Sequence, residues 1–289
     1  MARALPRARA CLHSAAMYNV AISFGAAVAG YFLGWLVAGW LAGFIPAILA
    51  FAAVFILLGR RTMQQVEAVA REAMADMQAG RADAAKQRLL AAIPLGRWQF
   101  LVAEQLYGQV GMIDYMQAVG LKMQRQLTPA AARLAEARSH LEKSWTRDWR
   151  ARAALAVIHH REGRVDDAVK VFEGASGGGA AEPMFWGLWA HVLNEAKRRD
   201  EALKVVGRGL EQNKGSAPLV EVQEALSNRK RPAFKKAFGE AWFQYFPDDM
   251  SQEELIAMHT AATGKPPPGA PGGGAPKGRS PKTWPMPRR

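Results

Sequence analysis

The chain has 289 residues, half of them apolar, with 38 Lys and Arg against 25 Asp and Glu and a single Cys. One Cys excludes an internal disulfide framework and any zinc site built from several cysteines. The basic excess is mostly terminal, since residues 1–59 hold three Arg, residues 264–289 hold six Lys or Arg, and neither range contains an acid. The middle is therefore close to neutral, and we expect no basic face that grips nucleic acid.

A long apolar run follows the N-terminal segment. No charged residue stands between Arg9 and Arg60, and the 42 residues Met17–Leu58 are almost wholly apolar. As a helix this run would span roughly 63 Å, enough to cross a hydrocarbon core of about 30 Å twice. It predicts a two-helix transmembrane hairpin over 17–59 that reverses near Gly39–Gly43. A cleaved signal peptide is the alternative, but its apolar core would be only about 7 to 15 residues long.

The charges that flank the hairpin predict its orientation. Basic residues precede the first span and follow the second, while the turn has none, so the positive-inside rule places both termini and the repeat domain in the cytoplasm. Met17 is an alternative start of translation, in which case the orientation depends on Arg60 and Arg61 alone. The high use of Ala, Gly and Arg is typical of GC-rich bacterial genomes, so the expected location is the bacterial inner membrane.

Glycines recur at a spacing of four in the hairpin, as Gly30-x-x-x-Gly34 and Gly39-x-x-x-Gly43. Such spacing lets helices approach closely. We expect these glycines to pack the hairpin against itself, and dimerisation is the alternative.

Beyond Arg61 the chain is expected to form successive amphipathic helices separated by short Gly, Pro or Asp turns, with no alternating pattern typical of a strand. Gly80 and Gly163 each stand at the end of one helix, and an Asp three residues later begins the next. The expected helices are 62–79, 82–93, 97–110, 112–126, 129–146, 149–162, 165–175, 183–197, 199–213, 217–228 and 231–246.

Part of this body repeats with a period of 34 residues. Matching positions are Leu155-Ala156 and Trp189-Ala190, Gly163 and Lys197, and Ala168-x-x-x-Phe172 and Ala202-x-x-x-Val206. This pattern resembles the tetratricopeptide repeat family, whose unit is a 34-residue helix-turn-helix. Small residues stand where helices cross closely and large residues fill the gaps. The residues expected to pack the repeats are Leu155, Ala156, Ala168, Phe172, Trp186, Trp189, Ala190 and Ala202.

The resemblance implies a fold and a kind of function. Members of that family stack helix pairs into an α-solenoid, here over 62–247, and bind proteins on a concave face lined by the first helix of each pair. Chaperone-binding members use a basic, Asn-rich clamp, but Val157 and His191 stand where Asn would be expected, so we expect no carboxylate clamp. The residues carried over to the groove are Arg150, Val157, His160, Arg161, Met184, His191, Asn194 and Glu195.

No local pattern indicates catalysis, a cofactor or a metal site. His159 and His160 are adjacent and would point about 100° apart on a helix, which does not suit one metal. The run Gly177–Gly179 follows a helix and precedes no Lys-Ser/Thr pair, so it is interpreted as a flexible linker rather than a phosphate-binding loop. Cys11 lies outside the helical body, where reversible lipidation is an alternative role. We therefore expect a protein that is not an enzyme.

The ends of the chain differ from its body. Residues 1–16 form a basic N-terminal segment, and 248–263 contain a short acidic closing helix. The Pro- and Gly-rich basic tail, 264–289, is expected to be disordered. An aromatic cluster at Trp242–Phe246 is expected to be buried, with contact to a partner or to the membrane as the alternative.

The sequence thus predicts an all-α, membrane-anchored adaptor or scaffold that recruits partner proteins to the cytoplasmic face of the membrane. The alternative is a structural or assembly subunit of a larger membrane complex, or a homo-oligomer, in which the hairpin packs against other spans. Both leave the partner unidentified, and either the groove or the tail is available to bind it.

Overall fold

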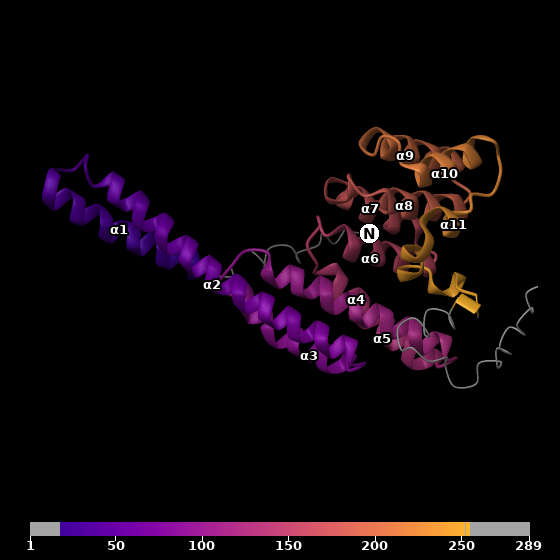
Figure 1. The fold of residues 1–289 in the computed structure, drawn as a ribbon, viewed down its shortest axis with the longest axis horizontal. Helices are drawn as coiled ribbons and strands as arrows, with labels where there is room; N and C mark the ends of the chain where they lie inside the picture. The colour runs from indigo at the N-terminus through magenta and orange to yellow at the C-terminus, as the bar shows by residue number, and fades with distance from the viewer. Residues whose placement is uncertain (1–17, 252, 255–289) are drawn as a thin grey trace, which may run out of the picture. The chain divides into compact units, whose positions relative to one another are not determined.

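A computed structural model describes residues 18–251, 253 and 254 (Figure 1). The described part is all-helical and contains no strand, as the sequence predicts. The predicted N-terminal segment 1–16 and tail 264–289 lie outside the described residues. The chain divides into two compact units, Met1–Tyr245 and Phe246–Arg289.

Of the second unit the structure describes only the beginning. A short 3₁₀ helix, η4, covers Pro247–Asp249. Ser251 and Glu254 then form a capping box, in which the Glu254 amide donates to Ser251 Oγ at 3.2 Å and the Ser251 amide donates to Glu254 Oε2 at 2.7 Å. This motif begins a helix where the sequence predicts one, and the rest of that predicted helix lies outside the described residues.

Two helices are long and apolar enough to cross a membrane: α1, Tyr18–Ala38, and α2, Phe44–Gln78. They lie side by side in Figure 1. Gly39, with a φ of 88°, supplies the left-handed residue of the reversal. The expected break between a helix that ends at residue 59 and one that begins at residue 62 is absent, because α2 continues through Arg60 and Arg61. Gly59 does not end the helix, because the residues that follow it, mainly Arg, Gln, Glu and Ala, favour helix and continue it.

The glycines of the hairpin serve close approach between its own two helices. A Cβ on Gly30 would stand 2.9 Å from the Pro46 carbonyl oxygen, and one on Gly34 would stand 2.8 Å from the Gly43 Cα. Such separations leave no room for a side chain. Three of the four predicted packing glycines therefore lie within the hairpin contact, and the fourth, Gly39, makes its turn.

The remaining helices follow in short succession. Two aromatic and apolar clusters form the core of this region, one around Leu106 and Leu89 and the other around Phe172 and Trp189. The elements are α3 (Ala82–Ala92), η2 (Ile93–Arg97), α4 (Val102–Met123), α5 (Leu127–Glu142), α6 (Trp149–Arg161), α7 (Val165–Gly179), α8 (Pro183–Glu195), α9 (Arg199–Gln212), α10 (Ala217–Ser227), α11 (Phe234–Phe238) and η3 (Gly239–Gln244).

One turn recurs between these helices and divides them into pairs. In each case a left-handed residue follows the helix, its amide donates to the carbonyl three residues back, and the next amide donates to the carbonyl five residues back. This is the Schellman motif, which satisfies carbonyls that the helix end leaves open. The left-handed residues are Gly80, Arg125, Lys197, Gly163 and Arg229, and they join α2 to α3, α4 to α5, α8 to α9, α6 to α7 and α10 to the segment that contains α11.

Two predicted boundaries are wrong for a common reason, and a third predicted helix is shorter than expected. The break expected near Gly111 is absent, and α4 is continuous there because Gly111 allows Leu141 of α5 to approach. The run Gly177–Gly179 is the last turn of α7 and no linker, since a Cβ on Gly179 would overlap the Phe185 ring. These glycines serve helix contact rather than chain reversal. The helix expected over 231–246 is instead the short α11 followed by η3.

Candidate protein-binding face

The eight residues expected to pack the repeats all lie inside the helical body. Each is at most 4% exposed, as the packing role requires. Phe172 of α7 stacks on Trp189 of α8, with ring centroids 5.8 Å apart, and Trp189 stacks on Trp186 at the same distance. The equivalent alanines at the helix crossings, Ala156 and Ala190, are fully buried. Large rings against small residues are what close helix packing needs.

The residues assigned to the groove lie on α6 and α8, which pack against each other. Their exposure divides them. Val157 is fully buried and Met184 is 9% exposed, so neither presents a side chain to a partner. Arg150 and Glu195 are exposed. We name the surface formed by α6 and α8 at these positions the α6–α8 face.

A segment of the chain itself lies on the α6–α8 face. It consists of α11, η3 and Tyr245, and we name it the C-terminal segment, residues 234–245. The ring of Phe238 lies against Gly187 of α8, and a Cβ at that position would overlap the ring. His191 stands between two rings of the segment, 5.0 Å from Phe234 and 4.9 Å from Trp242. The middle of the α6–α8 face is therefore covered by aromatic side chains.

Polar bonds complete this docking at the end of the segment. The backbone carbonyl of Tyr245 accepts the hydroxyl of Tyr115 at 2.6 Å and Nη2 of Arg161 at 3.3 Å. Trp242 and Tyr245 are each 1% exposed, so within the first unit the alternative that they form an exposed surface is wrong. Aromatic rings in such a position are buried because the adjoining helices leave an apolar surface to be covered.

Enclosure among rings changes the protonation of the histidines on this face. Burial, with further contributions from His160 and Arg231, lowers the pKa of His191 to about 3. Burial also lowers the pKa of His160, whose ring lies 6.2 Å from that of His191. Both side chains are therefore neutral near pH 7. A neutral pair suits contact with aromatic rings better than contact with an acidic partner.

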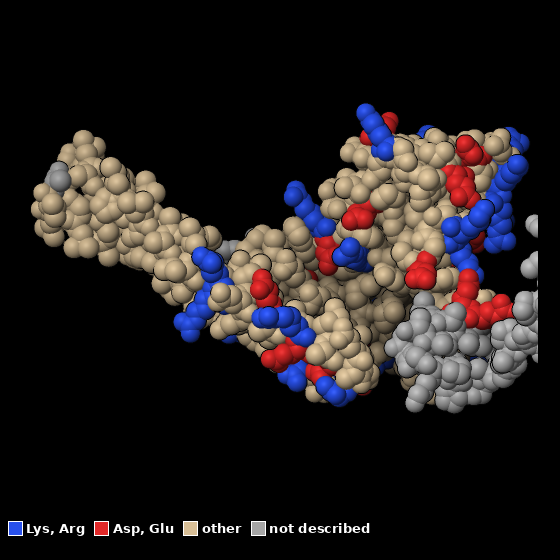
Figure 2. All heavy atoms as spheres, in the orientation of Figure 1, with Lys and Arg blue, Asp and Glu red and all other residues tan. Residues whose placement is uncertain are grey.

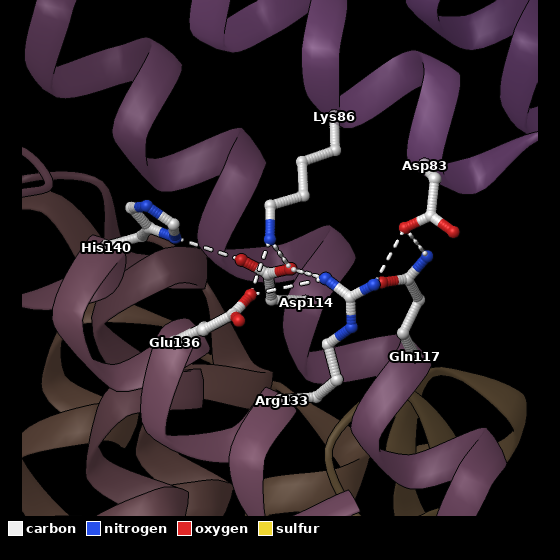
Figure 3. Close-up of polar contacts among 7 residues, drawn as sticks. All are labelled: Asp83, Lys86, Asp114, Gln117, Arg133, Glu136 and His140. Carbon is white, nitrogen blue, oxygen red and sulfur yellow. Dashed lines mark hydrogen bonds and ion pairs between the residues drawn. The ribbon is translucent and has the colours of Figure 1, made fainter. Parts of the chain in front are cut away.

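Away from this face, a charged cluster joins three helices (Figure 3). Asp114 of α4 is fully buried, and its carboxylate lies 2.6 Å from Lys86 Nζ of α3 and 2.9 Å from His140 Nδ1 of α5. Glu136 and Arg133, also of α5, extend the cluster, with Glu136 Oε2 at 2.7 Å from Lys86 Nζ. Alternating charges at these distances form a structural tie between the first and second helix pairs.

The protonation of this cluster follows from its contacts. Burial alone would lower the pKa of Lys86, but its bonds to Asp114 and Glu136 outweigh burial and raise that pKa. The same bond to Lys86 lowers the pKa of Glu136. The ion pairs therefore persist at neutral pH. Sequence reasoning did not find this cluster, although one charge at Asp114 among the apolar residues of 110–119 is a signal that it needs a partner.

The surface carries both signs of charge. In Figure 2 Lys and Arg alternate with Asp and Glu over the helix pairs, while α1 and the first half of α2 carry neither. Among the described residues no three His, Cys, Asp or Glu side chains are grouped so that they would hold a metal ion. The α6–α8 face is therefore the candidate site that both the sequence and the geometry single out.

Comparison with known proteins adds no assignment. The chain matches no model of a known protein family, and no curated protein shows a significant match to it. The tetratricopeptide resemblance therefore stays a prediction, which depends on the 34-residue spacing and on the repeated helix pairs.

Proposed function

We propose that this protein is a membrane-anchored adaptor whose tetratricopeptide-like helix pairs form an α-solenoid and recruit partner proteins to the cytoplasmic side of the membrane. The hairpin α1–α2 anchors the chain, and the helix pairs from α3 onward present the binding surface. The tail 264–289 is a disordered extension in this proposal. The function is recruitment by local concentration, without chemistry.

One observation carries the proposal: the α6–α8 face accepts an aromatic segment through a matched position. Phe238 fits over Gly187, and His191 is enclosed by two further rings. A surface that holds a short, aromatic segment in this way has the features of a peptide-binding groove. The C-terminal segment therefore models the kind of partner segment that we expect, one short and rich in aromatic residues.

The occupancy of the face also gives the proposal a mechanism. A partner that uses the middle of the face must displace residues 234–245, whereas Arg150 and Glu195 remain exposed for first contact. The partner then binds more weakly, by the free energy that is needed to displace the segment. Partners with a weak match are excluded in this way.

The proposal is tested by tagging the full-length chain, solubilising it in mild detergent and identifying the proteins that copurify with it. Arg150→Ser with Glu195→Ser should reduce recovery of a soluble partner, while Phe234→Ala with Phe238→Ala should increase it, because the segment then docks less tightly. Lys214→Ser is the matched control, since Lys214 is an exposed charge in the turn between α9 and α10, outside α6 and α8. If neither double variant changes the recovery of a soluble partner, or if only integral membrane proteins are recovered, the adaptor function is contradicted.

A further inference from the structure

The connection between the first and second helix pairs exposes two aromatic side chains. This connection, residues 93–101, contains η2 and leads to the start of α4. Trp98 is 38% exposed and Phe100 is 60% exposed. Arg97 beside them is exposed and forms no salt bridge among the described residues. Two exposed rings and a free cation so close together mark an interaction surface.

The 93–101 connection is held firmly from its inner side. Ile93 and Leu95 pack against the apolar cluster of the first two helix pairs. A Cβ on Gly96 would stand 2.5 Å from Cβ of Ala103, and Leu101 adopts a left-handed φ of 68°. A chain so closely packed cannot turn its outer side chains inward. Trp98 and Phe100 therefore stay on the surface.

The same connection touches the beginning of the first apolar helix. The ring of Trp98 lies 5.3 Å from the ring of Tyr18, the first residue of α1. Both rings are exposed on their other sides, with Tyr18 42% exposed. The connection therefore meets the hairpin at one end of its apolar surface.

That end coincides with the boundary of the apolar run in α2. Gly30 of α1 packs against Pro46 of α2, and the two helices run in opposite directions. Tyr18 lies 12 residues before Gly30, and the residue 12 positions after Pro46 is Leu58, which ends the apolar run shortly before Arg60 and Arg61. Both arginines are exposed and form no salt bridge among the described residues. Aromatic rings beside cations at the end of an apolar helix match the composition of a membrane–water interface.

We propose that the 93–101 connection is a third contact with the bilayer, in addition to the two spans. Trp98 and Phe100 insert at the headgroup level, and Arg97 binds lipid phosphate together with Arg60 and Arg61. Because the connection and the two arginines both adjoin the same end of the apolar run, an anionic leaflet is the surface that matches them in both polarity and charge. This contact fixes the rotation of the helix pairs about α2, and it rests on the membrane insertion of the hairpin that the proposed function assumes.

The test uses the full-length chain with Cys11→Ser, which removes the single Cys. A nitroxide is attached at Phe100→Cys, and the chain is reconstituted into phosphatidylcholine vesicles with and without phosphatidylglycerol. Collision of the label with oxygen, which concentrates in lipid, is compared with collision with a water-soluble nickel complex. Ile48→Cys, a 67% exposed position within the apolar run, is the lipid control, and Val220→Cys, 37% exposed on α10, is the water control.

We expect the label at position 100 to have a ratio of oxygen to nickel collision between those of the labels at 48 and 220, and closer to that at 48 when phosphatidylglycerol is present. Arg97→Gln should reduce that lipid-dependent gain, and Lys214→Gln should not. If the label at 48 reports lipid while the label at 100 is as open to nickel as that at 220, the third contact is overturned and the hairpin stands. If the label at 48 is itself open to nickel, membrane insertion fails and the proposed function fails with it. If the label at 100 is shielded from nickel in detergent as well, and its spectrum shows spin–spin broadening, the surface binds a second copy of the chain. That result would overturn the lipid contact.

Discussion

The ring of Phe238 occupies the space that a side chain on Gly187 would need. Gly187 lies in the middle of α8, on the face that the repeat pattern assigns to partner binding. Only a residue without a Cβ allows the C-terminal segment to dock there. This one contact therefore connects the packing of the fold with the accessibility of the candidate site.

Gly187→Ala should loosen the C-terminal segment. The added methyl group overlaps the Phe238 ring, so we expect a loss of about 1 to 3 kcal/mol in the free energy of unfolding and faster tryptic cleavage after Arg229 and Lys230. Gly207→Ala on α9 is the matched control, because a Cβ there meets nothing within 4 Å, and it should stabilise the protein by about 0.5 to 1 kcal/mol. Equal cleavage rates in both variants would show that the segment does not depend on this contact.

Asp114 should be among the most sensitive charged residues. Asp114→Ala leaves Lys86, whose side chain is 11% exposed, without its buried partner, and breaking a buried pair costs about 3 to 5 kcal/mol. Urea unfolding followed by tryptophan fluorescence measures the loss. Asp166→Ala also removes an ion pair, the one with Arg198, but the Asp166 side chain is 82% exposed. This variant should therefore cost no more than about 1 kcal/mol. A similar small loss for both would mean that the cluster does not tie the helix pairs together.

The repeated turns predict opposite effects at equivalent positions. Lys197 holds the left-handed conformation, with a φ of 62°, that Gly163 holds in the preceding pair. Lys197→Gly should therefore raise the free energy of unfolding by roughly 0.5 to 1 kcal/mol, and Gly163→Ala should lower it by about 1 kcal/mol, because a Cβ disfavours this conformation. Thermal unfolding in detergent measures both. A loss on Lys197→Gly would show that the lysine makes a compensating contact.

Acidification should weaken the protein through His191. Its pKa is about 3 in the folded state, against about 6.5 for an unfolded histidine. Between these values the unfolded chain binds a proton that the folded chain does not, so stability falls as the pH falls, by at most about 1.4 kcal/mol per pH unit for this group. Urea unfolding at pH 7 and pH 5 should show a smaller pH effect in His191→Gln than in the parent protein. An unchanged pH effect would assign it to other groups.

The positions of the helices depend mainly on residues that are close together in the chain, and many of them could be predicted from the sequence. The apolar run before Arg60 predicts the two long apolar helices, and the Gly-x-x-Asp turns at Gly80 and Gly163 predict the joints of two helix pairs. Both signals lie in continuous stretches of the chain, the first as a run of apolar residues long enough for two spans and the second through the conformational freedom of glycine. The 34-residue spacing locates the buried residues of α6 to α9 for the same reason, since each contact is between neighbouring helices.

The same local reasoning fails where a residue serves contact with a distant helix. Helix breaks are expected after 126 and 228, but Arg125 and Arg229 adopt the left-handed turn conformation there without glycine, so composition does not identify the residues that make those two turns. Gly111 and Gly179 are predicted as breaks but lie within helices. The absence of a side chain at each position allows a residue of a neighbouring helix to approach closely. A glycine that ends a helix and a glycine that admits a neighbour are identical in sequence.

The sequence by itself therefore determined the all-helical class, the apolar hairpin and the burial of the eight residues expected to pack α6 to α9, all of which depend on spacing along one or two helices. Only the tertiary structure decided that residues 234–245 cover the α6–α8 face, that Asp114 joins three helices, and that Trp98 meets Tyr18. These three relationships join residues that are far apart in the chain. Their formation depends on how the helix pairs stack, and no local pattern records that.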